Sequence, residues 1–243
     1  MILTIANQKG GSGKSTTAAA LAQAASYRGR RCLALDLDPQ GNLSFFLKAD
    51  ATRAGSFELL QGEPATIQAT ESGPDVIAAS WNLQTITSSR GSARRLLTAL
   101  EPLRGLYELI VIDTPPTAGE LQYNALMASD NLIIPLAADI VGLQGLYQMA
   151  DTARQIQRSN SALALTGYIL TRHGSRSTLA RQLTDTIKER ATALGIPFLA
   201  AIREAVAIRE AQTLQQSLYS YAPRSKPAQD YLELFDRLAE GGL

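Results

Sequence analysis

A glycine-rich segment near the start of the chain has the composition of a phosphate-binding loop. It consists of Lys9, Gly10, Gly11, Ser12, Gly13, Lys14, Ser15 and Thr16. Glycines let the backbone wrap closely around phosphate oxygens, and a following helix adds partial positive charge at its N-terminus. Lys14 can reach the β- and γ-phosphates of a nucleotide, and the Ser15 hydroxyl can bind Mg²⁺. The segment therefore predicts a site for a nucleoside triphosphate and its metal ion.

The loop departs from the common pattern G-x-x-x-x-G-K-[ST] at its first position. Gln8 stands where the first glycine is expected, and Lys9 supplies a second lysine. A glycine-rich turn that binds nothing is the alternative for the loop, and a solvated surface residue is the alternative for Lys9. The order of apolar segment, loop, Lys-Ser pair and helical segment favours phosphate binding.

Acidic residues follow two apolar segments of the chain. Asp36 and Asp38 come after the segment 32–35, and Asp113 ends the run 109–112. Ligands of α/β sheets bind in the crevice at the carboxyl ends of the strands. A buried acid is costly unless it meets a cation, and an aspartate at the place of Asp113 holds Mg²⁺ in phosphate-loop proteins. Capping of a helix or strand end is the alternative for Asp38 and Asp113.

The elements that would position these residues alternate along the chain. Short apolar runs predict strands, and longer amphipathic runs predict helices. The predicted strands are 2–6, 32–35, 76–79, 109–112, 132–136, 163–170 and 198–202. The predicted helices are 15–27, 93–100, 119–128, 143–158, 177–193, 207–215 and 227–239, with a short helix and loops in 49–75. We expect an α/β fold in one domain over residues 1–243, with a mostly parallel twisted sheet and helices on both faces.

The composition narrows the class of protein. The 243 residues are 45% hydrophobic and 19% charged, which is typical of a globular domain. A single cysteine (Cys32) and a single histidine (His173) exclude an intrachain disulfide, a cysteine-built cluster and a multi-histidine metal site. The start of the chain lacks a basic leader before an apolar core, and no apolar run reaches about 18 residues. A soluble cytoplasmic protein is expected.

Several segments resemble the ParA/MinD family of P-loop ATPases, whose phosphate loop is a deviant Walker A motif. The loop reads KGGxGK[ST], as in that family. The segment DLDPQGN at 36–42 resembles the family's first switch, and DTPP at 113–116 resembles the second switch. Residues 119–146 and 210–234 resemble the segments that follow in ParA proteins. The resemblance covers nearly the whole chain.

The resemblance implies roles for individual residues. Lys9 would reach across a dimer interface to the phosphates of the partner's nucleotide, and Asp38 would position or activate the attacking water. Asp36 would support the phosphate and metal shell, which Ser15 and Asp113 complete. The adenine would lie between the Thr171–Arg172 turn and the loop after residue 202. The cofactors implied are ATP and Mg²⁺, with Lys9, Lys14 and Asp38 as catalytic residues.

Charge is distributed unevenly along the chain. Overall, 23 basic residues nearly balance 22 acidic ones, so a uniformly basic coat is excluded. Residues 154–226, however, carry 11 Lys and Arg against 4 Asp and Glu, a balance of +7, and the rest carries −6. This asymmetry favours a basic face for an anionic polymer, and ordinary solvated helix faces are the alternative. The candidate DNA-binding residues are Arg172, Arg176, Arg203, Arg209, Arg224 and Lys226, of which the last two are favoured.

The leading hypothesis is a short ParA-type partition ATPase without an N-terminal helix-turn-helix domain. ATP would drive formation of a sandwich homodimer that binds nonspecific DNA. A ParB-like centromere-binding partner would stimulate the weak, Mg²⁺-dependent ATP hydrolysis and thereby drive plasmid or chromosome partition. The protein would be cytoplasmic, and associated with the nucleoid when ATP is bound.

Three alternatives come from other classes of protein. A ParA-like ATPase that positions cargo other than DNA has the same ATPase features. A MinD-like membrane positioner needs a basic amphipathic helix at the C-terminus. Residues 229–243 are mostly acidic where they are charged, so anionic lipid would repel them and no membrane partner is expected. An electron-transfer ATPase like the nitrogenase iron protein needs two cysteines in each subunit, and this chain has one.

Overall fold

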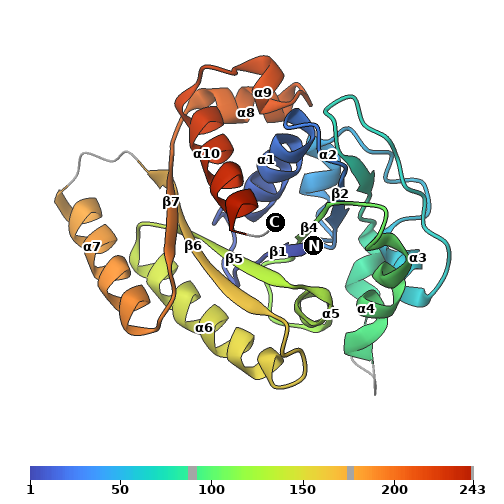
Figure 1. Cartoon of the computed structure of the whole chain (residues 1–243), viewed down its shortest axis with the longest axis horizontal. Helices are drawn as coiled ribbons and strands as arrows, with labels where there is room; N and C mark the ends of the chain where they lie inside the picture. Colours follow the sequence, from blue (N-terminus) through green and yellow to red (C-terminus); the bar gives the residue numbers. More distant parts are fainter. Residues whose placement is uncertain (87–91, 174–177, 242–243) are drawn as a thin grey trace.

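The computed structural model describes residues 1–86, 92–173 and 178–241, and side chains outside 173–180 within that part. Its centre is a seven-stranded sheet in the order β3-β2-β4-β1-β5-β6-β7, in which every neighbouring pair is parallel (Figure 1). The strands are β1 (Ile2–Ile5), β2 (Cys32–Asp36), β3 (Asp75–Ile77), β4 (Leu109–Asp113), β5 (Asn131–Ala137), β6 (Ala164–His173) and β7 (Phe198–Arg203). The α/β fold with a parallel sheet is confirmed.

Helices connect the strands and cover both faces of the sheet. They are α1 (Lys14–Tyr27), α2 (Asn42–Phe46), α3 (Ser56–Gln61), α4 (Arg95–Leu100), α5 (Glu120–Ala128), α6 (Ile140–Gln157), α7 (Thr178–Ala193), α8 (Val206–Thr213), α9 (Leu218–Tyr221) and α10 (Lys226–Glu240). Short 3₁₀ helices are η1 (Trp81–Thr85), η2 (Ser92–Arg94) and η3 (Glu101–Leu103). Helices α1, α2, α8, α9 and α10 pack on one face, and α3 to α7 pack on the other (Figure 1).

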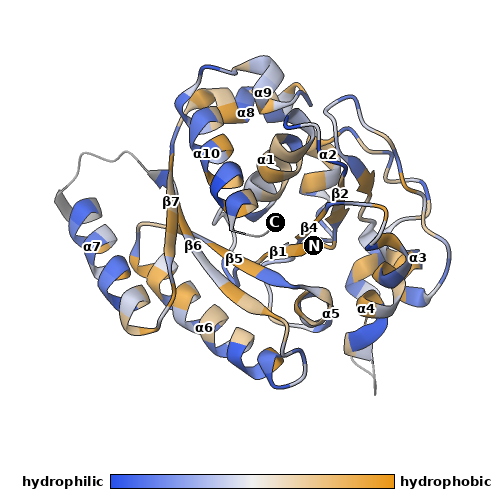
Figure 2. Cartoon of the chain, viewed as in Figure 1, coloured by the Kyte–Doolittle hydropathy of each residue, from blue (hydrophilic) through white to orange (hydrophobic). Residues whose placement is uncertain are grey.

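The strands are apolar along their whole length because both faces of the sheet are buried. In β4, Leu109 and Val111 point to the core on the α1 side, while Ile110 and Ile112 point to the opposite core. Figure 2 shows apolar residues along the strands and hydrophilic residues on outer helices such as α7 and α10. The carboxyl ends of β1, β2 and β4 therefore meet at one edge of the sheet, where the candidate residues follow each strand.

Helix α10 uses its apolar side inside the molecule. Tyr231, Leu234 and Phe235 are buried against the core that includes α1. The Tyr231 hydroxyl lies 3.1 Å from Thr17 Oγ1, and Asp236 forms an ion pair with Arg28. The apolar residues of the C-terminal segment thus belong to the core. In the part of the chain that the structure describes, no helix is long and apolar enough to cross a membrane.

The helices differ most from the sequence prediction at α2, α6 and α9, and the other predicted helices agree within one or two residues at each end. Helices α2 and α9 have five and four residues, too few to produce a periodic pattern. Gly41, at φ +66°, is the N-cap residue of α2, which begins directly after the acidic segment. Helix α6 begins three residues earlier than predicted because the Asp139 carboxylate accepts the Gly142 N–H at 2.5 Å and caps the first turn.

Replacing Phe235 tests the docking of α10 on the core. Phe235→Ala should lower the free energy of unfolding by about 3–5 kcal/mol, because it leaves a cavity between α10 and α1. Glu233→Ala, at an exposed position of the same helix, should change it by less than about 0.5 kcal/mol. Urea denaturation measures both, and equal stabilities of the two variants would contradict the docking.

Candidate nucleotide-binding site

The glycine-rich loop connects the buried strand β1 to α1. Gly11 and Gly13 have φ of +72° and +90°, a left-handed conformation that favours glycine. An added Cβ at Gly11 would meet nothing within 4 Å, whereas at Gly13 it would lie 3.1 Å from the Thr171 side chain. The loop is therefore open around Gly11, and Gly13 is required where β6 approaches it.

Lys14 is the first residue of α1 and is almost entirely buried. Its side chain is 6% exposed, and its Nζ donates a hydrogen bond to the Lys9 carbonyl oxygen at 3.2 Å. Burial lowers the pKa of Lys14, while the charges of Asp113 and Asp38 act in the opposite direction. The ammonium group thus lies inside the loop and close to the acidic residues, where it can bind phosphate.

Asp36 anchors the segment that follows β2. Its Oδ1 accepts the Asp38 N–H at 3.0 Å, and its Oδ2 accepts the Ser44 N–H and hydroxyl at 2.8 and 2.7 Å. Burial raises the pKa of Asp36 to about 6, and the bonds from Ser44 oppose that rise. Both oxygens are therefore used to hold residues 37–44 in place. Asp38, which is 5% exposed, is positioned by this segment near Lys14.

Asp113 has a carboxylate oxygen that the protein leaves without a partner. It lies beside Asp36 across the β2–β4 pair and is fully buried. Its Oδ1 accepts the Thr114 N–H at 3.0 Å, but Oδ2 has no hydrogen bond from the described residues. Burial raises the pKa of Asp113 well above the usual range, and the charge of Asp36 adds to this rise. Ser15 and Lys14 oppose it. The unpaired Oδ2 of Asp113 and the nearby Ser15 hydroxyl are oxygen atoms of the kind that Mg²⁺ prefers as ligands.

A cavity of about 280 Å³ adjoins the loop on the side of β6 and β7. Its lining includes Gly13, Thr16, Thr171, Arg172 and Ile202. The Thr171 hydroxyl lies 3.0 and 3.1 Å from the carbonyl oxygens of Ser12 and Leu136, which fixes this turn against the loop. The cavity is therefore where the sequence prediction places the adenine.

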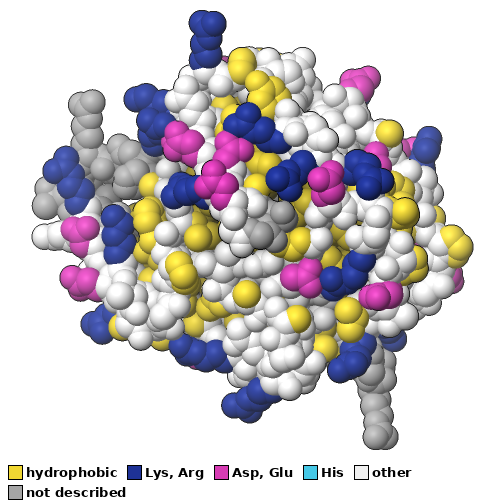
Figure 3. Space-filling view, in the orientation of Figure 1, with side chains coloured by type: hydrophobic (Ala, Val, Ile, Leu, Met, Phe, Trp, Pro, Cys, Tyr) yellow, Lys and Arg dark blue, Asp and Glu magenta, His cyan; other side chains and the backbone are white. Residues whose placement is uncertain are grey.

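The candidate DNA-binding residues have different environments. Arg203 donates to Asp230 through Nε and Nη2, at 3.0 and 2.6 Å, and Arg209 lies 3.5 Å from Glu204. Arg172, Arg224 and Lys226 are exposed, whereas Arg176 lies outside the described residues. On the face drawn in Figure 3, basic and acidic side chains alternate, so this face has no continuous basic patch.

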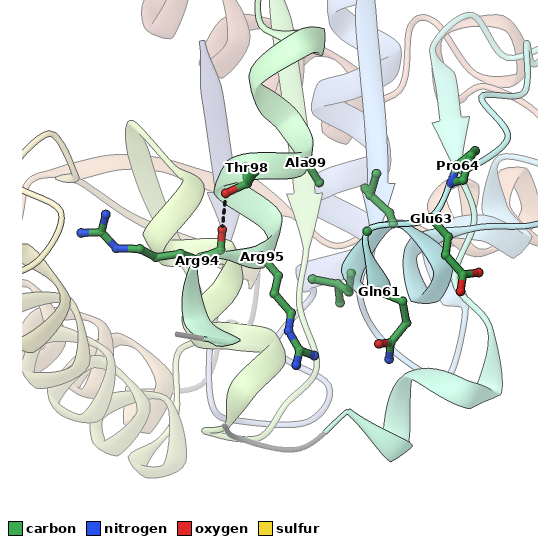
Figure 4. Close-up of a pocket in the computed structure, with 10 residues that line it drawn as sticks. Gln61, Glu63, Pro64, Arg94, Arg95, Thr98 and Ala99 are labelled. Carbon is green, nitrogen blue, oxygen red and sulfur yellow. Dashed lines mark hydrogen bonds between the residues drawn. The ribbon is translucent and has the colours of Figure 1, made fainter. Parts of the chain in front are cut away.

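A second, larger cavity lies away from the loop, between α3 and α4. It measures about 640 Å³ and is lined by Leu59, Leu60, Gln61, Gly62, Glu63, Pro64, Arg94, Arg95, Thr98 and Ala99. Figure 4 shows that Arg94 points away from Gln61 and Glu63. This cavity shares no residue with the phosphate loop or the three aspartates, so the candidate site remains at the carboxyl edge of the sheet.

Sequence reasoning missed several residues that shape the site. Ser44 holds Asp36, and Gln212 donates to the Thr16 hydroxyl at 2.9 Å. The Asn7 side chain accepts the Lys9 N–H at 3.1 Å and donates to the Pro135 carbonyl at 2.7 Å. The only signal for Asn7 was its position near the start of the loop. Ser44 lies eight residues after Asp36 with no motif to mark it, and Gln212 lies 196 residues from Thr16.

Comparisons with known proteins agree with this geometry. A family model described as an AAA domain matches residues 1–165. Sporulation initiation inhibitor protein Soj of Bacillus subtilis is 34% identical over 253 residues, covering 99% of both chains. Chromosome partitioning protein ParA of Caulobacter vibrioides is 35% identical over 246 residues, covering 96% of this chain and 91% of that protein.

Solved structures share the whole fold. A cobyrinic acid a,c-diamide synthase of Mycobacterium smegmatis, solved with an ATP analogue and magnesium, has a TM-score of 0.85 at 30% identity, covering 98% of this chain and 94% of that one. The cell division ATPase MinD of Pyrococcus furiosus has a TM-score of 0.82 at 25% identity and covers 99% of each chain. The fold and loop define a P-loop ATPase. Within that class, the chain belongs to the ParA/MinD family.

The orphaned oxygen of Asp113 predicts how the site responds to magnesium. Mg²⁺ should strengthen ATP binding by the unmodified protein, and Asp113→Asn should weaken the apparent affinity for Mg²⁺ by about 10- to 100-fold. Titration of a fluorescent ATP analogue at increasing Mg²⁺ measures this. Asp75→Asn, at the opposite end of the sheet, is the matched control. An Asp113→Asn protein with unchanged Mg²⁺ dependence would remove Asp113 from the metal site.

Proposed function

We propose that this protein is a ParA-type ATPase that binds ATP with Mg²⁺, forms an ATP-dependent sandwich dimer and acts in DNA partition. A ParB-like partner would stimulate its slow hydrolysis, and the dimer would bind DNA without sequence preference, associating with the nucleoid. The observation that carries the proposal is a phosphate loop with two lysines, of which Lys14 lies close to the buried carboxylates at the edge of the sheet. Full-length similarity to proteins named Soj and ParA supports it further.

The environment of Lys9 supports the proposal of an ATP-dependent dimer. Its backbone is fixed within the loop, since its N–H binds Asn7 and its carbonyl accepts Lys14 Nζ. No described ion pair involves the Lys9 side chain, so its ammonium is free to meet phosphate. Lys14 already lies inside its own loop. A second lysine is therefore best used on the nucleotide of a second copy.

Asp38 supports hydrolysis. The Gln40 N–H donates to its Oδ1 at 3.0 Å, and its backbone is tied to Asp36. The carboxylate is held at the edge of the site, close enough to Lys14 for their charges to interact. In this position it would orient a water for attack on the γ-phosphate, while the metal bound near Ser15 and Asp113 would neutralise the developing charge.

The environments of the basic residues narrow the proposed DNA surface. Arg203 and Arg209 have carboxylate partners, which offset their charge. Arg224 and Lys226 are exposed on either side of Ser225, the N-cap residue of α10, and no described ion pair includes them. A two-fold dimer would present each of them twice, so DNA affinity would depend on ATP.

Replacing Lys9 tests the dimer. The unmodified protein should dimerise with a slowly hydrolysed ATP analogue and Mg²⁺, but not with ADP. Lys9→Ala should weaken the dimer and ATP turnover about tenfold or more, while ADP affinity changes little, because Lys9 acts on the partner's nucleotide. Analytical ultracentrifugation and ADP titration give both quantities, with Lys48→Ala as a surface-lysine control. Equal loss of ADP affinity in Lys9→Ala would show that Lys9 acts within its own subunit.

Reversing charges at the start of α10 tests the DNA surface. Arg224→Glu combined with Lys226→Glu should abolish DNA retention at physiological salt while ATP-driven dimerisation survives. Arg224→Ala alone should lower the slope of log K against log salt by about one to two per dimer. The matched control is Lys48→Glu with Arg53→Glu. Unchanged DNA affinity in the double reversal would place the DNA surface elsewhere or favour a cargo other than DNA.

A further inference from the structure

Gln8 occupies the first position of the loop, where the common pattern has glycine. Its side chain is directed toward the helices on the α5–α6 face of the sheet. Gln8 Nε2 donates to Gln122 Oε1 on α5 at 3.2 Å and to Thr152 Oγ1 on α6 at 2.9 Å. One side chain thus connects the start of the phosphate loop with two helices that lie 114 and 144 residues away in sequence.

Both partners of Gln8 are buried. Gln122 is 0% exposed and Thr152 is 9% exposed. The Thr152 hydroxyl donates its own hydrogen to the Gln148 carbonyl at 2.9 Å, so its lone pair is available to Gln8. Gln122 Nε2 has no partner among the residues the structure describes. A buried polar group that is only partly satisfied is uncommon where apolar packing would suffice, which indicates a role beyond filling space.

Asn7, the residue before Gln8, packs closely against the same helix. An added Cβ at Gly145 of α6 would lie 2.6 Å from Asn7 Oδ1, so glycine is required for α6 to approach this closely. Asn7 Oδ1 also accepts the Lys9 N–H. Gly145 and Thr152 are two helical turns apart on α6, and they contact consecutive residues of the loop. The segment that carries Lys9 therefore contacts α6 at two points, through a hydrogen bond at Gln8 and close packing at Asn7.

Helix α5 begins close to the proposed metal site, and α6 begins with exposed apolar residues. Helix α5 begins four residues after the Asp113–Pro116 segment, which holds the proposed metal ligand. The first turn of α6 carries the exposed side chains of Ile140 and Val141, at 64% and 46% exposure. A shift of the loop entrance on nucleotide binding would be transmitted to both helices through contiguous hydrogen bonds.

We propose that Gln8 is a positioning residue that couples the phosphate loop to α5 and α6 and thereby sets the position of Lys9. This inference rests on the ATPase function proposed above. Gln8 does not contact the nucleotide phosphates in this role, because its amide is engaged by Gln122 and Thr152. Removing the hydrogen bonds that Gln8 makes with Gln122 and Thr152 should disturb the placement of Lys9 in the transition state while leaving the ADP site intact.

The test replaces Thr152, the partner of Gln8 on α6. Thr152→Val removes the hydroxyl at constant volume and should lower kcat for ATP about fivefold or more, with ADP affinity within about twofold of the unmodified protein. Thr152→Ser keeps the hydroxyl and should retain the original kcat. Thr192→Val is the matched control, because Thr192 makes the same bond to the carbonyl four residues earlier but is exposed on α7. Melting temperatures are measured for each variant.

A double-mutant cycle separates a coupled link from two independent defects. Gln8→Ala should also lower kcat, and Gln8→Ala combined with Thr152→Val should be no slower than the slower single variant. Should Thr152→Val fail to fold, Gln122→Met removes the other acceptor at similar volume and takes its place in the cycle. A normal kcat in these α5 and α6 variants, additive losses, or a parallel loss of ADP affinity would overturn the proposal.

The same samples distinguish failure of this inference from failure of the proposed function. The unmodified protein's own ATP-dependent dimerisation and DNA binding test the function. The pattern of kcat among the Gln8, Gln122 and Thr152 variants tests the coupling. If the unmodified protein hydrolyses ATP but binds no DNA, the proposed partition role is contradicted. The kcat values of the variants still test the role of Gln8 in that case.

Discussion

Burial of four charged side chains at one edge of the sheet is the constraint on which the rest of the structure depends. Asp36 and Asp113 are fully buried side by side, Asp38 is nearly so, and Lys14 supplies one opposing charge. Burial raises the pKa of Asp36 and Asp113, and the neighbouring carboxylate charges raise it further, because three carboxylates face one ammonium in a region of low dielectric. A divalent cation at the unsatisfied oxygen of Asp113 would neutralise that excess.

The parallel sheet makes this arrangement possible. Because every strand runs in the same direction, the segments that follow β1, β2 and β4 meet at one edge. The Ala-rich helix α1 is buried between the sheet and α10, so the loop before it has a fixed support. Ser44 then secures Asp36, and Thr171 secures Ser12. Rigid elements thus hold the site, and the glycines supply the backbone shape that phosphate needs.

The parts that the sequence predicted depend on local pattern, and the parts it missed depend on distant contacts. The seven strands were visible because fully buried strands are continuously apolar, and the loop and the three aspartates because each lies at or just beyond the end of such a strand. Helix α2 was missed because five residues show no periodicity. The Gln8–Thr152 bond and the Arg203–Asp230 pair join residues that are 144 and 27 positions apart, so no local sequence pattern predicts these contacts. Arg203 consequently appeared in the sequence as an available cation, although Asp230 engages it.

A crystal structure of the unmodified protein with a slowly hydrolysed ATP analogue and Mg²⁺ tests the central claim most directly. The account predicts a two-fold dimer with Mg²⁺ near Ser15 and Asp113, the base in the cavity beside Thr171, and Lys9 of each subunit on the phosphates of the other's nucleotide. A nucleotide bound elsewhere, or a Lys9 that contacts only the nucleotide of its own subunit, would contradict it.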